Sequence, residues 1–155
     1  MSETFELNDV FPKVCDEVIG YGGIERNLHY YPYLLQCLEN VQKRKSIVAF
    51  LKKNSIDRVG LYAINEFMDY IIRDIEIDSL EELRVYDKNA QRYESGHLGQ
   101  AVFDFDMLIE DYKNSLISKI IICNLYHANE IANSLICKGV KGEDIISVDM
   151  LIYAL

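Results

Sequence analysis

A chain of 155 residues is long enough to form one domain with a substantial buried core. Half of its residues are hydrophobic and 26% are charged, a balance typical of globular proteins. The formal net charge of −9 is uneven, because residues 1–57 carry −1 and residues 58–155 carry −8. Binding to nucleic acid or to anionic lipid starts from clustered Lys and Arg, so this balance predicts neither a nucleic-acid nor a membrane partner.

The cysteines and the start of the chain predict a cytoplasmic protein. No C-x-x-C pair or regular framework connects the cysteines, which are Cys15, Cys37, Cys123 and Cys137. Met1–Thr4 lacks the basic and apolar regions of a signal peptide, and no apolar run approaches the roughly 20 residues that cross a bilayer. Reduced structural thiols are expected, with a redox or metal role as the less favoured alternative.

Residues 1–57 are predicted to form an N-terminal helical extension packed on the core. Apolar spacing predicts a helix over about residues 8–19, ended by the glycines of residues 20–23. His29–Tyr33 predicts an aromatic loop or helix start, which either packs on the domain or stacks on a base or sugar; packing is favoured. A single long helix is expected over residues 33–54. Its basic run, Lys43–Lys45, is expected on a solvated face, with attraction of phosphate as the alternative.

Residues 58–155 alternate between strand and helix patterns. Strands are predicted over residues 58–62, 83–87, 100–103, 119–124 and 143–148. Helices are predicted over residues 66–77 and 128–138, after Asp104 or Asp106, and as a short docking tail over residues 149–155. This alternation requires a parallel sheet with right-handed crossovers, and therefore predicts a three-layer, Rossmann-like α/β fold with strand order 3-2-1-4-5.

In this strand order, a ligand crevice is expected between the carboxyl ends of the first and fourth strands. Asp87 is added at the end of the second strand as a candidate ribose acceptor, with an ordinary turn residue as the alternative. The residues predicted at the crevice itself are Ala63, Ile64, Asn65, Glu66, Asn124, Leu125, Tyr126 and His127.

Several of these residues have a second interpretation. His127 is the strongest candidate for function, as a general base or ligand-binding group, although an exposed or helix-capping His is more common. Asn65 is expected to cap the following helix, and Glu66 to disfavour bound phosphate. His97 lies in a polar loop, where it could reach a ligand but is more simply a surface side chain. The three His are far apart in sequence and show no metal-binding pattern.

The run Arg58-Val59-Gly60-Leu61-Tyr62-Ala63-Ile64-Asn65-Glu66-Phe67 resembles the strand–turn–helix that opens Rossmann-like domains of bacterial sugar-modifying proteins. Examples are the N-terminal sugar-nucleotide domain of left-handed β-helix acyltransferases and domains attached to sugar methyltransferases. The similarity continues at Val85–Asn89 and Ile120–Ile122 and reaches Ile145–Ser147. The family's glycines are replaced by Ala63, Asn65 and Met68, so the glycine motif is degenerate.

The resemblance implies a domain that binds a nucleotide, sugar or sugar-nucleotide, or has lost that ability. It places Asp87 near a ribose and the amides of residues 65–67 near an anion. An accessory role in bacterial carbohydrate or cell-surface polysaccharide metabolism follows from it. No G-x-S-x-G, P-loop or H-E-x-x-H motif is present, which makes an enzyme acting alone the weaker hypothesis.

Two alternatives remain open. One is an interaction or oligomerisation module that works through the N-terminal helices, as a homo-oligomer or with another protein. The other is a small enzyme that uses His127 with Asp87 or Asn124. A polar crevice beside Asn65 and His127 would favour a ligand, whereas an exposed apolar face on residues 28–51 would favour a protein partner.

Overall fold

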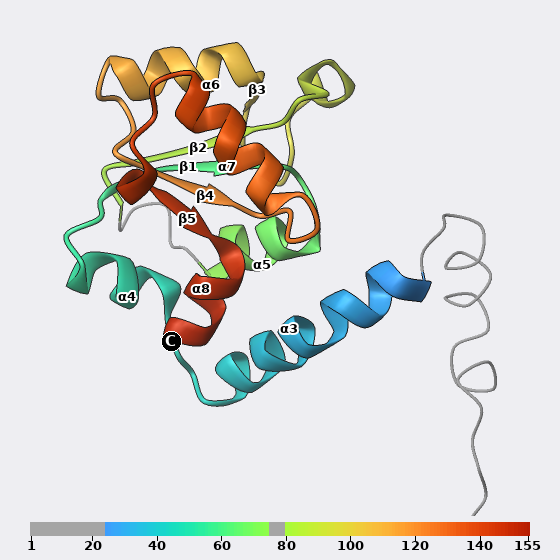
Figure 1. Ribbon diagram of the computed structural model, residues 1–155. Coiled ribbons are helices and arrows are strands. Elements are labelled where there is room, and N and C mark those ends of the chain that lie inside the picture. The colour runs from blue at the N-terminus through green and yellow to red at the C-terminus, as the bar shows by residue number, and fades with distance from the viewer. Residues whose placement is uncertain (1–23, 75–79) are drawn as a thin grey trace, which may run out of the picture.

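The computed structural model describes residues 24–74 and 80–155, with side chains from Tyr30 onward (Figure 1). The helix expected over residues 8–19 lies outside the described residues. A single five-stranded sheet has the order β3-β2-β1-β4-β5, and all its strand pairs are parallel. The predicted α/β fold and strand order are therefore confirmed. The strands are β1 (Arg58–Tyr62), β2 (Glu82–Tyr86), β3 (Val102–Phe103), β4 (Lys119–Ile122) and β5 (Ile145–Ser147).

Helices cover both faces of the sheet and make three layers (Figure 1). Helices α6 (Phe105–Lys113) and α7 (Ala128–Cys137) lie on one face. Helices α5 (Glu66–Asp74) and α8 (Val148–Ala154) lie on the other, with α3 (Ile24–Gln42) and α4 (Ile47–Lys53) beyond them. The apolar tail predicted over residues 149–155 belongs to helix α8. This helix docks on the core, since its residues Val148, Leu151 and Ile152 are buried.

The central strand β4 shows why its sequence is continuously apolar. Ile121 packs into the core on the α5 and α8 side, whereas Ile120 and Ile122 pack into the core beneath α6 and α7. Side chains alternate between the faces of a strand, so a strand covered on both faces needs an apolar residue at every position.

The single helix expected over residues 33–54 is wrong, since the chain turns between α3 and α4. Arg44 has a φ of +53°, and the Lys45 amide donates to the Asn40 carbonyl at 3.0 Å. Ser46 then caps α4, accepting a hydrogen bond from the Ala49 amide. The basic run therefore forms the turn between two helices rather than a solvated helix face.

A side chain from α5 helps to fix this turn. The Asp74 carboxylate accepts a hydrogen bond from the Ile47 amide at 2.7 Å, across 27 residues of sequence. This bond satisfies one of the amides that every helix start leaves without an intrahelical partner. Helical periodicity cannot reveal such a contact, because it depends on the tertiary fold.

The aromatic segment is neither a loop nor a helix start, because α3 runs through it with Pro32 inside. Tyr30 is 2% exposed and meets the Phe67 ring edge-to-face, with centroids 5.4 Å apart. Farther along α3, the buried Asn40 donates to the Ile152 carbonyl of α8 at 2.8 Å. These contacts join α3 to the core on the α5 and α8 face of the sheet.

The connections that precede β3 and β5 contain further local structure. Two 3₁₀ turns, Ala90–Tyr93 and Gly142–Asp144, precede β3 and β5 respectively. Ahead of β3, His97 and Gln100 form an isolated antiparallel bridge, so the third strand is shorter than the expected residues 100–103. Across the described ranges, no helix combines the length and apolarity that a membrane span requires.

Candidate functional site

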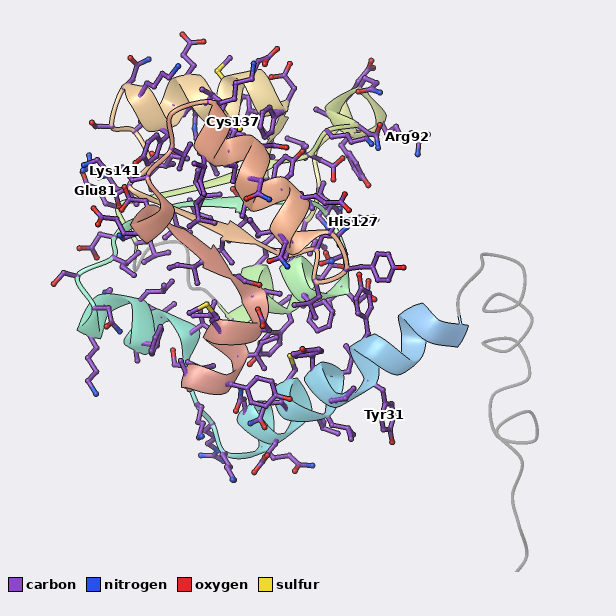
Figure 2. All side chains as sticks on the ribbon, in the orientation of Figure 1. Tyr31, Glu81, Arg92, His127, Cys137 and Lys141 are labelled. Atoms are coloured by element: carbon purple, nitrogen blue, oxygen red, sulfur yellow. The ribbon has the colours of Figure 1, made fainter. Side chains whose placement is uncertain are left out.

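A cleft of about 620 Å³ opens at the carboxyl ends of β1, β2 and β4, the switch point of the sheet. Figure 2 shows His127 at this end of the sheet, with Glu81 and Lys141 at the opposite end. The cleft is lined by Tyr62, Ala63, Ile64, Asp87, Lys88, Asn89, Phe105, Asn124, His127, Glu130, Ile131 and Ser134.

The structure divides the predicted site residues into two groups. Those that line the cleft are Ala63, Ile64, Asp87, Asn124 and His127. Those outside its lining are Asn65, Glu66, Leu125 and Tyr126. Glu66 instead lines a second cleft of about 460 Å³ between α3 and α5.

The turn after β1 keeps the backbone path of a glycine turn without the glycine. Ala63 has a φ of +75°, a region that residues with a Cβ rarely adopt. Its amide donates to the Tyr86 carbonyl of β2 at 3.0 Å, which holds the turn against the neighbouring strand. Ala63, which stands where the resembling domains have glycine, therefore adopts a conformation that usually requires glycine.

Asp87 uses both carboxylate oxygens to hold backbone amides. Its Oδ2 accepts from the Ile64 amide at 2.8 Å, and its Oδ1 accepts from the Asn89 amide at 2.7 Å. The first bond joins the turn after β1 to the end of β2, and the second shapes the turn that follows β2. Because each carboxylate oxygen has a second lone pair, Asp87 can still accept a hydrogen bond from a ligand hydroxyl.

Asn65 is engaged in a similar way and caps α5, as expected. Its Oδ1 accepts from the amides of Phe67 and Met68, both at 3.1 Å, and its Nδ2 donates to the Cys123 carbonyl at 2.8 Å. The Phe67 amide, which the family resemblance assigned to an anion, is thus already bound by a side chain. Glu66 in the same helical turn adds a negative charge that opposes phosphate.

The opposite wall of the cleft is built by the connection between β4 and α7. The Asn124 Oδ1 accepts from the His127 amide at 3.0 Å, which fixes the start of α7. The exposed His127 ring has its Nδ1 3.2 Å from Glu130 Oε2 and meets the Tyr126 ring edge-to-face at 4.9 Å. His127 therefore lines the cleft from the position just before α7. The Glu130 carboxylate, about one helical turn later, lies beside its ring.

Apolar and aromatic side chains form the interior of the cleft. Tyr62 is nearly buried and packs against the Phe105 ring, with centroids 5.6 Å apart. Burial, assisted by the Asp87 carboxylate, raises the pKa of the Tyr62 phenol to about 12. The phenol therefore stays protonated at neutral pH and can donate a hydrogen bond.

The charges of the cleft do not suit a strongly anionic ligand. Lys88 is the single Lys or Arg in the lining, whereas Asp87 and Glu130 are both acidic. Among the described residues, no group of three or more His, Cys, Asp or Glu side chains is placed to hold a metal ion. The lining is better matched to the hydroxyl groups of a ligand. Carboxylates and side-chain amides form hydrogen bonds with hydroxyls, and such a ligand needs no positive charge to balance it.

Sequence reasoning missed seven of the twelve lining residues. Phe105 could have been found, because it follows the third strand and the carboxyl ends of parallel strands share one edge of the sheet. Glu130 and Ser134 lie one and two turns beyond His127 on the same side of α7, so helical spacing also pointed to them.

His97 is neither in the cleft nor a plain surface side chain. Its Nε2 lies 2.6 Å from Asp69 Oδ1 of α5, and its ring meets the Tyr93 ring edge-to-face. This contact ties the loop between β2 and β3 to α5, across 28 residues of sequence. The role of His97 in the described structure is to position that loop.

No protein-family model matches this sequence, and no curated protein is significantly similar to it.

Proposed function

We propose that this protein binds a small polyhydroxylated ligand in the cleft at the switch point of its sheet. The ligand class is a sugar, or the sugar portion of a nucleotide or sugar-nucleotide. The observation that carries the proposal is the pairing of hydrogen-bonding walls with an aromatic interior. Asp87 and Asn89 follow β2, Asn124 and Glu130 follow β4, and the Phe105 ring, which packs against Tyr62, belongs to the same lining.

The hydrogen-bonding state of the turn favours hydroxyls over phosphates. The amides of Ile64, Phe67 and Met68 are bound by side chains of this chain, so they do not need an anion. Lys88 offers one positive charge to a ligand, and two carboxylates in the same lining counter it. A pyrophosphate seated on the turn, as in a dinucleotide-binding domain, is the least supported ligand.

The resemblance of the first strand–turn–helix to bacterial sugar-modifying proteins supports the same ligand class. On that basis, the role proposed is accessory: a binding domain in carbohydrate or cell-surface polysaccharide metabolism. The proposal concerns binding and includes no catalytic step.

A thermal-shift screen tests this proposal with the purified chain. The panel contains free hexoses, nucleosides, sugar-nucleotides and a dinucleotide, each as a concentration series. A ligand present at 100 times its dissociation constant adds about 2.7 kcal/mol to the free energy of unfolding, which gives a clear rise in melting temperature. We expect a sugar or sugar-nucleotide to produce this rise. The dinucleotide should raise the melting temperature no more than the corresponding nucleoside does.

A matched pair of substitutions on α7 tests whether a rise in melting temperature comes from a ligand bound in the cleft. Ser134→Phe places a ring in the cleft lining, whereas Asn133→Phe places the same ring on an exposed neighbour outside it. We expect Ser134→Phe to abolish the shift and Asn133→Phe to preserve it. The proposal fails if no member of the panel raises the melting temperature, or if Ser134→Phe binds as well as the parent chain.

A further inference from the structure

Helix α3 exposes a row of large apolar side chains that the rest of the described chain leaves uncovered. Their exposed fractions lie between 43% and 61%, and Figure 2 shows Tyr31 pointing away from the sheet. The row, named here the α3 seam, consists of Tyr31, Leu34, Leu35, Leu38 and Val41. It runs beside the buried face of α3, which is formed by Tyr30, Cys37 and Asn40.

The spacing of the seam is that of a helix that pairs with another helix. Tyr31, Leu34, Leu38 and Val41 follow one another at intervals of three, four and three residues. This alternation of three and four is the pattern of core positions in a helical pair. Leu35 widens the row at its centre.

These intervals of three, four and three residues are the same when the helix is followed from either end. If a two-fold axis crosses the helix near Gln36, Tyr31 of one copy faces Val41 of the other, and Leu34 faces Leu38. A symmetric dimer requires this kind of self-complementary patch. Antiparallel pairing also places the helix dipoles in opposite directions, which is favourable.

The charges of the protein allow contact along this helix. From Tyr30 to Gln42, Glu39 is the single charged residue, and it is paired with Lys43 one turn later. The net charge of −8 on residues 58–155 makes two copies repel each other across most other surfaces. At its C-terminal end, Val41 borders Glu66, Asp69, Arg73 and Asp74 of α5 in the second cleft, so acidic charge lies beside that end. The middle of the seam, around Leu34 and Leu38, is therefore where a second copy meets the least charge repulsion.

The area of the seam matches a reversible dimer. A fully buried aromatic side chain removes roughly 150–250 Å² from solvent, and the four aliphatic side chains of the seam remove less. Five half-exposed side chains on each of two copies therefore correspond to at most on the order of 1,000 Å². Specific interfaces begin near this size, and the smaller ones are weak or transient. We infer that two copies of this chain associate through their α3 seams, antiparallel, as a weak symmetric dimer.

Sedimentation velocity of the full chain over a concentration series from about 1 to 200 µM tests the association. We expect the weight-average mass to rise from one chain toward two within this range. Leu38→Glu places a charge in the middle of the seam and is expected to weaken dimerisation at least tenfold. Met150→Glu is the matched control, because Met150 is an exposed apolar residue on α8 outside the seam, and its dimerisation should equal that of the parent.

Cross-linking tests the orientation. In a Cys15→Ser, Cys137→Ser background, a short bis-maleimide is expected to join two copies of Leu35→Cys, which lies near the proposed axis. The same reagent should not join two copies of Tyr31→Cys, because five residues from the axis in each copy separate the thiols by roughly 15 Å along the helices.

Three results would overturn the inference. A single-chain mass at every concentration excludes the dimer. Equal cross-linking of Tyr31→Cys and Leu35→Cys shows a parallel arrangement. A monomer in which Leu38→Cys is alkylated far more slowly than the exposed Cys137 shows that the chain covers its own seam.

Discussion

The Asp87 carboxylate accepts a hydrogen bond from the Ile64 amide at 2.8 Å, and this bond joins the ends of two neighbouring parallel strands. The other oxygen of the same carboxylate holds the Asn89 amide at 2.7 Å. A side chain that the family resemblance assigned to a ligand thus holds two backbone amides of its own chain.

Removing this carboxylate should destabilise the fold. We expect Asp87→Ala to lower the free energy of unfolding by about 2 kcal/mol, because two partly buried amides lose their acceptor. Asp87→Asn should lose about 1 kcal/mol, since its amide group retains one acceptor oxygen. Urea denaturation measures both, with the exposed Gln91→Ala as the control. If Asp87→Ala is no less stable than Gln91→Ala, the carboxylate does not hold the turn.

Replacing Ala63 with glycine should stabilise the protein. The left-handed backbone at Ala63 costs a residue with a Cβ roughly 1–2 kcal/mol, and glycine avoids that cost. The greater freedom of glycine in the unfolded chain offsets part of the gain, which leaves about 0.5 kcal/mol. Ala63→Val should instead lose about 1–2 kcal/mol, because β-branched residues tolerate this conformation worst. Thermal denaturation of the three proteins should rank them Gly, Ala, Val, and any other order contradicts the strain.

The stability contributed by Asp144 should depend on pH. Burial acts to raise the pKa of this carboxyl, but hydrogen bonds from Lys119 at 2.6 Å and Tyr112 at 2.5 Å outweigh it and hold the pKa below its ordinary value. A carboxyl with a lowered folded-state pKa stabilises the fold at neutral pH. That contribution begins to fall near the unfolded value of about 3.9 and disappears below the folded-state pKa.

Asp144→Asn provides the measurement. At pH 7 its free energy of unfolding should be about 1 kcal/mol lower than that of the parent. The effect is modest because the ion pair between Lys119 and Asp144 is partly exposed. The difference should shrink as the pH falls below about 4. Glu94→Gln, an exposed substitution, should show no such pH dependence. A difference that stays constant from pH 7 to pH 3 would show that the carboxylate charge is not involved.

The described cysteines should differ sharply in reactivity. Burial raises the pKa of the Cys37 thiol to about 11 and also raises that of Cys123, whereas Cys137 is exposed on α7. At pH 8, about one Cys37 thiol in a thousand is therefore ionised, and the reagent cannot reach it in the folded protein. In a Cys15→Ser background, we expect one thiol to react rapidly with a disulfide reagent and two to react only on unfolding. Adding Cys137→Ser should remove the rapid phase; a second rapid thiol would contradict the burial of Cys37 or Cys123.

The fold was predictable where the sequence carries strong local patterns. The unbroken apolar run at Ile120–Ile122 indicated a strand buried on both faces, and Asn65 was a recognisable helix cap. The order of strands and helices then limited the sheet to a few topologies. The location of the cleft followed from the strand order, since a switch point is a property of topology.

What could not be predicted depends on contacts between distant residues. Lys43, Arg44 and Lys45 are good helix formers, so their sequence gave no sign of the turn that Ser46 and the distant Asp74 stabilise. Tyr30 and Tyr31 are adjacent and chemically identical, yet one is buried and the other is exposed. The anchoring of Asp87 to Ile64 and of His97 to Asp69 likewise became visible only when the strands and helices were placed in space.

The side chains that hold the turn after β1 also affect how the protein would meet a ligand. Asp87 and Asn65 supply, from within the chain, the acceptors that a phosphate supplies to an open glycine turn. The edge of the sheet is therefore preorganised, and little backbone ordering is needed when the cleft fills. Binding should then proceed with a small loss of conformational entropy, and exchange of the Ile64 and Met68 amide hydrogens should be slow whether or not a ligand is present.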